Sequence, residues 1–364
     1  MKPSPNLIKQ LTNIDGLLER ADPKVMFDTY FSSAENVLTA RALTRCVTPE
    51  PAVTTLEEGL FARNIEDERL QILEAGYRGL QKIRADGENA DLEPVEHFGA
   101  EAIILLEDRP AILIQRGEFL QVPPKWSILE GRKDGINKAT QSVGRIEVMG
   151  HPSYDWVGTG FLVADDVVMT NRHVADIFCH RPPRTRTWRF KPGMSGRIDY
   201  MEEWGVLEKA EFEFSSVIGV HDVYDLALFR VWRTSPSGAT PLQPLTIASE
   251  LPSTLAGRIV YTCGYPAWDG YRNDPVEMMR IFANIFNVKR LQPGELCGFD
   301  GNRNIVEHNC STLGGNSGSC VIDLEANLVV GLHFGGRYLE TNKAVALWRL
   351  RDDPLLKKAG VNFD

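Results

Sequence analysis

Hydrophobic residues follow two different spacings along this chain of 364 residues. In residues 1–90 they recur every three or four positions, a spacing that is typical of amphipathic helices. Leu7, Leu11 and Leu18 belong to one such series, which begins after Pro5. The pattern predicts three helices in this region, which are 5–18, 23–46 and 55–84.

The spacing changes after residue 90. Two short apolar runs, 102–106 and 111–115, flank a polar segment that ends at Pro110, and this arrangement predicts a β-hairpin. The proline-rich stretch 122–126 predicts a linker. We therefore expect three parts: a helical regulatory or adaptor domain over 1–90, a hairpin and linker strap over 91–140, and a third domain over 141–364.

The third domain contains short alternating segments that are typical of antiparallel strands. One covers 143–148, two flank the pair Asp165 and Asp166, and another covers 226–231. The segment that follows Asp166 ends just before His173, where a helical turn can begin. These segments predict a β-rich domain in which His173 lies at a strand end.

Residues 311–319, Ser-Thr-Leu-Gly-Gly-Asn-Ser-Gly-Ser, have the composition of a turn that can carry a nucleophile. A serine hydroxyl needs a base to accept its proton and N–H donors to hold the oxyanion that forms. Glycines let a turn direct its N–H groups inward without a Cβ clash. Ser317 is the candidate nucleophile, and the N–H groups of Gly315 and Ser317 are the candidate oxyanion donors. Taken alone, such a run is also a common plain turn.

Two further residues complete a candidate catalytic set. His173 can act as the base, and Asp225, which directly precedes an apolar alternating segment, can orient its imidazole. Singly, each also fits a structural histidine or a turn aspartate. The order His, Asp, Ser, with separations of 52 and 92 residues, makes the catalytic interpretation stronger than any of the three residues does alone.

Residues from about 142 to 350 resemble the chymotrypsin-type serine proteases. The matching motifs are Thr-Asn-Arg-His-Val at 170–174, Asp-Leu-Ala-Leu at 225–228 and Gly-Asn-Ser-Gly-Ser at 315–319. The resemblance implies an α+β chain, with a chymotrypsin-like double six-stranded antiparallel β-barrel beside a mostly helical N-terminal domain. It also implies peptide-bond hydrolysis through an acyl-enzyme.

Among these proteases the chain is most similar to the bacterial glutamyl endopeptidases, because the serine turn is followed by Val-Val-Gly-Leu-His-Phe-Gly-Gly at 329–336. The resemblance implies that Thr312 and His333 bind an acidic substrate side chain, which an imidazole favours especially when protonated. Ser311 stands where trypsin-like enzymes have an aspartate, so cleavage after Lys or Arg is not expected. Asn316 replaces the aspartate that pairs with a new N-terminal amine in zymogen activation, so activation by that salt bridge is not expected either.

Charge and composition limit the classes of partner that we expect for this protein. The net charge is −9, and residues 1–110 hold 20 acidic and 12 basic side chains, which disfavours nucleic-acid binding. The start of the chain lacks the apolar core of a signal peptide, and no apolar run is long enough to span a membrane. The six cysteines have no Cys-x-x-Cys spacing. We expect a cytoplasmic enzyme with protein or peptide substrates, no metal, no cofactor, and a regulatory protein partner at the helical domain.

Two other functions stay open at this point. One is a protein-quality protease of the high-temperature-requirement type, which shares the Thr-Asn-x-His-Val and Gly-Asn-Ser-Gly motifs. That type usually has a C-terminal peptide-binding domain, whereas this sequence ends at Asp364. The other is a non-catalytic scaffold, against which the complete candidate triad argues. A regulated protease of a bacterial stress or defence system is the favoured interpretation, by analogy.

Overall fold

The computed structural model describes residues 1–11, 13–28, 55–120, 122–185, 187–236, 238–239, 242–250, 254–267, 285–336 and 341–364. The predicted second helix beyond Asp28 lies outside the described residues, as does Cys46. The chain divides into two compact units. The first is made of 1–110, 121–127 and 270–285, and the second of 111–120, 128–269 and 286–364.

The first unit is helical, as predicted. Its helices are α1 (Pro5–Gln10), α2 (Ile14–Arg20), α3 (Pro23–Phe27), α5 (Thr55–Asp86), the short 3-10 helix η3 (Gly87–Asn89) and α6 (Pro94–Asp108). Ser4 and Asp22 cap α1 and α3 by accepting backbone N–H groups, and a proline follows each cap. None of the helices in the described ranges combines the length and apolar character needed to cross a membrane.

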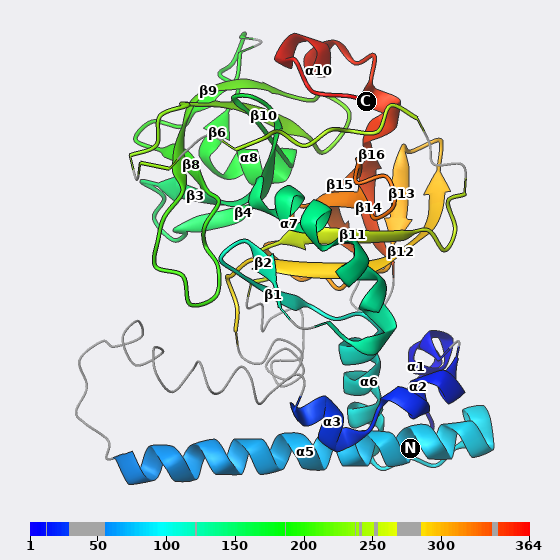
Figure 1. Cartoon of the computed structure of the whole chain (residues 1–364). Coiled ribbons are helices and arrows are strands. Elements are labelled where there is room, and N and C mark those ends of the chain that lie inside the picture. Colours follow the sequence, from blue (N-terminus) through cyan, green and yellow to red (C-terminus); the bar gives the residue numbers. More distant parts are fainter. Residues whose placement is uncertain are drawn as a thin grey trace. The chain divides into compact units, whose positions relative to one another are not determined.

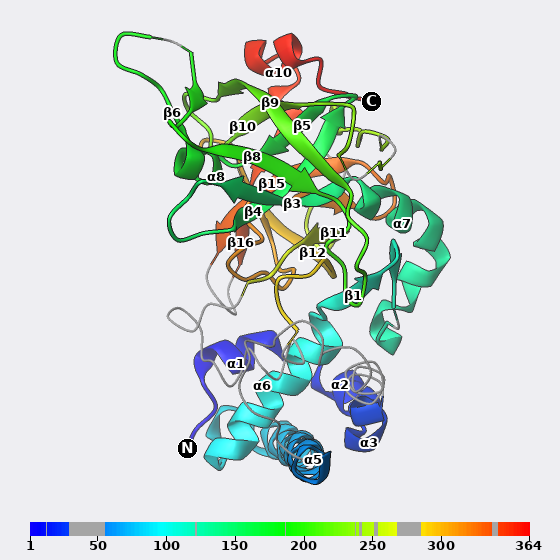
Figure 2. The same ribbon diagram turned by 90° about the vertical axis from the view of Figure 1, so that its left-hand side faces the viewer.

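Two glycines let α5 and α6 approach each other closely. A Cβ on Gly76 would lie 2.1 Å from the carbonyl carbon of Gly99, and one on Gly99 would lie 2.3 Å from the carbonyl oxygen of Ile72. Figure 1 shows α5 from the side and Figure 2 along its axis, and α6 crosses it in both views. Leu73, Leu80, Ile103 and Ile104 are buried around this crossing.

The hairpin predicted from 102–106 is wrong, because this run belongs to α6. A short apolar run does not by itself distinguish a strand from a buried helix face, and here Pro94 starts a helix whose apolar side packs on α5. The hairpin that does form joins β1 (Ile112–Gln115) to β2 (Glu118–Phe119). Its two turn residues, Arg116 and Gly117, have φ of 54° and 77°, the left-handed conformations of a tight two-residue turn.

The second unit contains two closed six-stranded antiparallel barrels, which confirms the predicted fold class. The strand order in the first barrel is β10-β5-β4-β3-β8-β9. Its strands are β3 (Val143–Met149), β4 (Trp156–Ala164), β5 (Val167–Thr170), β8 (Ser195–Asp199), β9 (Glu211–Val220) and β10 (Ala227–Val231). Phe178, Phe214 and Phe229 stack in its core, with ring centroids 4.6–6.2 Å apart.

The second barrel has the order β11-β14-β15-β16-β13-β12, and pairing of β11 with β12 closes it. Its strands are β11 (Ile259–Gly264), β12 (Arg290–Asp300), β13 (Ile305–His308), β14 (Cys320–Asp323), β15 (Val329–Gly336) and β16 (Asn342–Ala346). The β1–β2 hairpin extends this sheet, since β1 pairs with the start of β12. Val260, Leu296, Val306, Val321 and Val330 are among the buried side chains of its core.

Short elements complete the second unit or lead into it. They are η4 (Pro124–Arg132), α7 (Lys133–Gln141), α8 (Arg172–Phe178), β6 (Cys179–His180), β7 (Arg189–Phe190), η5 (Leu347–Leu350) and α10 (Pro354–Ala359). Strand β6 pairs with β7. The chain after α10 returns to the barrels, where Asn362 N–H donates to the carbonyl of Val163.

The close contact between α5 and α6 can be tested with one methyl group. Gly99→Ala should lower the free energy of unfolding by about 1–3 kcal/mol, because the methyl would overlap backbone atoms that cannot rotate away. Gly135→Ala is the matched control, since α7 has ordinary space there, with the nearest atom at 3.4 Å. Thermal unfolding followed by circular dichroism would contradict the packing if both variants kept the wild-type midpoint.

Candidate functional site

His173 and Asp225 meet because two paired strands bring their ends together. Strand β5 pairs with β10, with Thr170 opposite Ala227, so the residues that follow β5 and precede β10 lie side by side. His173 is the second residue of α8, which begins directly after β5. Its Nδ1 lies 2.7 Å from Asp225 Oδ2, and its backbone N–H donates to Asp225 Oδ1 at 3.0 Å.

The environment keeps Asp225 ionised. Burial alone would raise the pKa of its carboxyl, but hydrogen bonds and charge from His173, with a backbone hydrogen bond from Arg172, hold that pKa below the ordinary value. An ionised carboxylate can only accept a hydrogen bond, so Nδ1 of the neutral His173 imidazole must carry the proton that is donated to Asp225. The other nitrogen, Nε2, then carries no proton. This is the tautomer that a general base requires.

The Ser317 turn is bound to both barrels. Thr159 N–H, on β4 of the first barrel, donates to the Ser317 carbonyl at 2.8 Å, and Gly318 N–H donates to the carbonyl of His333 on β15 at 2.9 Å. A Cβ on Gly158 would lie 2.9 Å from both the Ser317 carbonyl oxygen and the side chain of Val174. The predicted nucleophile and the residue that follows His173 therefore flank the same glycine of β4.

The candidate oxyanion donors are oriented by hydrogen bonds to the backbone carbonyls that directly precede them. The Gly314 carbonyl accepts from Ala267 N–H at 2.6 Å, and the Asn316 carbonyl accepts from Ser319 N–H at 2.9 Å. In a trans peptide the C=O and the following N–H point in opposite directions. Fixing these two carbonyls therefore fixes the directions of the Gly315 and Ser317 N–H groups, before any substrate binds.

Two positions in the turn accept only glycine. Gly315 has φ of 88°, and a Cβ there would lie 2.3 Å from the carbonyl oxygen of Tyr265. Gly318 has φ of 91°, and its Cβ would lie 2.0 Å from the carbonyl oxygen of Thr159. The Gly315 carbonyl also accepts from the Thr159 hydroxyl at 2.8 Å. Glycine at both positions lets the turn lie against β4 with its N–H groups oriented.

Each of the two predicted specificity residues has a polar partner in the second barrel. The Thr312 hydroxyl donates to Asn342 Oδ1 at 2.8 Å, and Asn342 Nδ2 donates to the Cys310 carbonyl at 2.6 Å. Asn342 lies opposite His308 in the pairing of β16 with β13. His308 Nε2 lies 3.2 Å from His333 Nδ1, so the partners of Thr312 and His333 lie opposite each other on paired strands.

Both buried imidazoles are neutral near pH 7. Burial, with a smaller contribution from the nearby His173, lowers the pKa of His333 to about 3. Burial also lowers the pKa of His308 well below its ordinary value. The expectation that a protonated His333 favours a carboxylate is therefore corrected for the free enzyme. A neutral imidazole still donates one N–H, so His333 can bind a carboxylate by a hydrogen bond.

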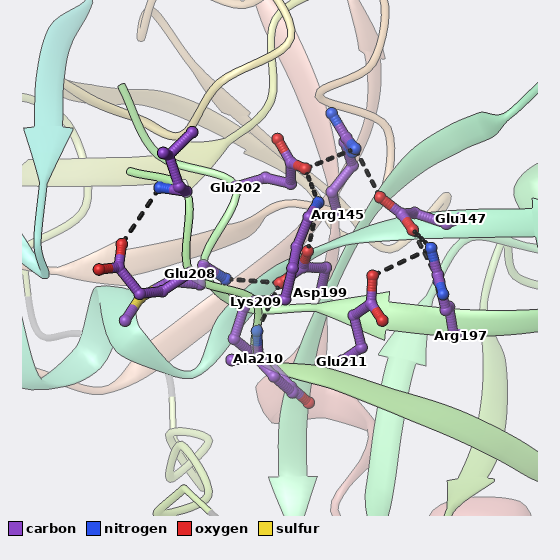
Figure 3. A network of polar contacts seen from close by, with 12 residues as sticks. Arg145, Glu147, Arg197, Asp199, Glu202, Glu208, Lys209, Ala210 and Glu211 are labelled. Carbon is purple, nitrogen blue, oxygen red and sulfur yellow. Dashed lines mark hydrogen bonds and ion pairs between the residues drawn. The ribbon is translucent and has the colours of Figure 1, made fainter. Parts of the chain in front are cut away.

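Three further carboxylates cluster on the first barrel without a vacant metal position. Glu147, Asp199 and Glu202 lie close enough to share an ion. Figure 3 shows that basic side chains already occupy their oxygens. The pairs are Arg145 with Glu147 and Glu202, Arg197 with Glu147 and Glu211, and Lys209 with Asp199 and Glu202. Each of the three carboxylates is paired with at least one basic side chain, so the donor set does not fit an additional cation.

Sequence reasoning missed Thr159, His308 and Asn342. Each acts through a contact with a residue far away in the chain: Thr159 with the Ser317 turn, His308 with His333, and Asn342 with Thr312. Neither composition nor spacing signals these pairs, because they depend on which strands become neighbours. Cys310 and Cys320, which flank the turn in the sequence, are buried and form no disulfide with another described cysteine.

One protein family matches the part of the chain that contains His173, Asp225 and Ser317. Residues 158–332 match the family described as the trypsin-like peptidase domain. No curated protein matches the chain. Among solved structures, the chain is similar to the Rv3671c protease of M. tuberculosis in its inactive form, with 20% identity over 65% of this chain and 96% of that one and a TM-score of 0.41.

The chain is also similar to a serine endoprotease from Yersinia pestis, with 15% identity over 62% of this chain and 66% of that one and a TM-score of 0.41. The family match covers β4, α8 and the Ser317 turn, which are the elements that carry the site. Residues 158–332 therefore form a trypsin-like peptidase domain, and the chain that carries it is a serine endopeptidase.

Proposed function

We propose that this endopeptidase hydrolyses peptide bonds with Ser317 as nucleophile, His173 as general base and acid, and Asp225 as the group that orients the imidazole. The observation that carries the proposal is the 2.7 Å contact between His173 Nδ1 and Asp225 Oδ2. A non-catalytic scaffold has no need of that pair or of a preoriented glycine turn.

The proposed mechanism assigns a step to each of these groups. Ser317 Oγ attacks the peptide carbonyl while His173 Nε2 takes its proton, and the Gly315 and Ser317 N–H groups stabilise the oxyanion. His173 then returns the proton to the leaving amine, which leaves an acyl-enzyme on Ser317. Water, activated by the same imidazole, hydrolyses the ester and restores the hydroxyl. Asp225 stays ionised and stabilises the imidazolium that forms.

Removing either reacting group should abolish hydrolysis. Ser317→Ala and His173→Ala should each lower kcat by several orders of magnitude, because nucleophile and base act as a unit. Asp225→Asn should lower kcat by about 10⁴-fold through the wrong imidazole tautomer. Peptide cleavage assays and labelling by a fluorophosphonate probe measure these losses. Near wild-type cleavage by Ser317→Ala would reject the proposal.

The same site supports a preference for Glu, with Asp second, before the scissile bond. His333 is joined through its backbone to the Ser317 turn. We infer that its ring N–H donates to a carboxylate that enters beside that turn. The Thr312 hydroxyl can rotate from Asn342 toward the same carboxylate. His308, behind His333, limits which nitrogen of that ring donates. Glutamate brings its charge farther into such a pocket than aspartate does.

Changing His333 tests this preference. His333→Ala should lower kcat/KM for peptides with Glu before the scissile bond by about tenfold to over a hundredfold, because a buried carboxylate loses a partner worth about 1–3 kcal/mol. Peptides with Ala at that position should change little and serve as the control. A wild-type cleavage profile dominated by Lys, Arg or large apolar residues, and unaltered in His333→Ala, would contradict the acidic preference. It would not contradict the assignment as a serine peptidase.

The pH dependence follows from the neutral state of His333. Its pKa of about 3 lies far below the assay range, so its protonation does not change between pH 6 and 9. We therefore expect the ratio of kcat/KM for a Glu peptide to that for the matched Gln peptide to stay constant over this range. A ratio that falls steadily toward pH 9 would instead indicate a protonated imidazole in the complex.

Regulation by the helical region is the remaining part of the proposal. Residues 1–110 concentrate negative charge and lie upstream of every proposed catalytic residue. The segment that follows them forms β1, which pairs with the start of β12 in the peptidase unit. A change in the helical region can reach the second barrel through this continuous chain. A regulatory protein that binds the acidic helices and a bacterial stress or defence setting fit this arrangement.

A further inference from the structure

A second histidine–aspartate pair lies next to the proposed catalytic pair. His221 Nε2 lies 3.0 Å from Asp353 Oδ2, and the two side chains are only 11% and 16% exposed. Asp353 is the N-cap of α10, where its Oδ1 accepts the N–H groups of Leu355 and Leu356. In both views of the fold, α10 lies beside the first barrel (Figures 1 and 2). The Leu355 side chain lies against Gly219 of β9, where an added Cβ would be 2.6 Å from it.

The other nitrogen of His221 organises the turn that leads to Asp225. Val223 N–H and Tyr224 N–H both donate to His221 Nδ1 at 3.0 Å. The imidazole also lies against the Tyr224 ring, with centroids 4.8 Å apart. Accepting two N–H groups requires that Nδ1 carry no proton, so the ring is the Nε2–H tautomer, and that proton is donated to Asp353. Asp353 thereby selects the tautomer that the turn needs.

This turn is tied to the residue before the proposed base. The Arg172 guanidinium donates to the carbonyls of His221 and Tyr224, and His221 N–H donates to the Leu226 carbonyl at 2.8 Å. Asn171 Nδ2 holds the carbonyl of Asp225 itself at 2.9 Å. The position of the Asp225 carboxylate is thus set by contacts on both sides of its own residue. The contribution of His221 is to close the turn that precedes it.

A second histidine accepts two backbone N–H groups in the same way, in the segment between β3 and β4. Ser153 N–H and Tyr154 N–H donate to His151 Nδ1 at 3.2 and 3.1 Å, and the His151 ring stacks on Tyr154 at 4.9 Å. Both segments have a histidine followed three residues later by a tyrosine. The His221 turn differs in the Asp353 contact and in its position ahead of Asp225.

We propose that His221 is a positioning residue for catalysis and that Asp353, at the start of α10, holds it in the working tautomer. This inference rests on the proposed roles of His173 and Asp225. A turn that loosens would let the Asp225 carboxylate move from His173 Nδ1, and a misplacement of about 1 Å in a catalytic group can cost about a hundredfold in rate. Substrate binding would be affected far less, since none of the hydrogen bonds described for this turn involves Thr312 or His333.

Asparagine substitutions separate the tautomer from the helix cap. Asp353→Asn keeps an N-cap oxygen for α10, since asparagine caps as well as aspartate does. Its amide N–H would face Nε2, which favours the Nδ1–H tautomer and removes the acceptor for Val223 and Tyr224. We expect kcat to fall about tenfold to a hundredfold with KM changed by less than about twofold. Asp352→Asn is the control, because Asp352 is 88% exposed and pairs with Lys357.

Two variants of His221 separate its acceptor role from general packing. His221→Ala should lose activity as Asp353→Asn does. His221→Asn should recover most of kcat, because an asparagine oxygen accepts the N–H two residues on in the same kind of turn. Thermal unfolding of each variant accompanies the kinetics. A loss in His221→Ala that His221→Asn does not recover, or that follows the unfolding midpoint alone, would overturn the inference.

Nitrogen-15 NMR of the histidine rings gives a readout that does not need turnover. Wild-type His221 should be the Nε2–H tautomer, and Asp353→Asn should convert it and shift the ring signals of His173. An Nδ1–H tautomer in the wild type, or no change in Asp353→Asn, would contradict the inference. If Ser317→Ala is inactive while His221→Ala and Asp353→Asn cleave at the wild-type rate, the inference alone fails. If Ser317→Ala stays active, the proposed function fails first.

Discussion

The contact between β4 and the Ser317 turn is the constraint on which the site depends. Thr159 uses its N–H and its hydroxyl to bind the carbonyls of Ser317 and Gly315, and Gly318 packs directly on the Thr159 carbonyl. The proposed base comes from the first barrel and the proposed nucleophile from the second. A single strand that binds the nucleophile turn therefore fixes the relation between halves of the site that belong to different sheets.

Much of the remaining structure serves to orient groups before a substrate arrives. The carbonyls of Gly314 and Asn316 are held by N–H groups from the surrounding chain, so the N–H groups of Gly315 and Ser317, the proposed oxyanion donors, have fixed directions. His173 binds the Asp225 carboxylate, Asn171 binds the Asp225 backbone carbonyl, and His221 closes the turn that precedes Asp225. Rigid placement of this kind lowers the activation free energy of a reaction, because the entropy of ordering the groups has already been lost when the protein folded.

The two barrels differ in the charge state of their clustered ionisable groups. On the first barrel, ion pairs with Arg145, Arg197 and Lys209 neutralise a group of carboxylates (Figure 3). In the second, His308 and His333 are buried without a compensating carboxylate among the described residues, and burial keeps both neutral. An acidic side chain that enters beside His333 would meet hydrogen-bond donors and no net charge. Recognition there would depend on donor geometry and not on a salt bridge.

The sequence by itself predicted the class of fold and a candidate catalytic set, because the alternating segments are local and the three motifs resemble those of the chymotrypsin-type proteases. Alternating segments after residue 141 indicated the strands that form the barrels, and the motifs around His173, Asp225 and Ser317 indicated the catalytic set. Tertiary structure alone decided the state of His333 and its contact with His308, because burial of that pair depends on strands distant in the chain. It also decided that residues 102–106 are helical, since a short apolar run takes its conformation from what it packs against, here α5.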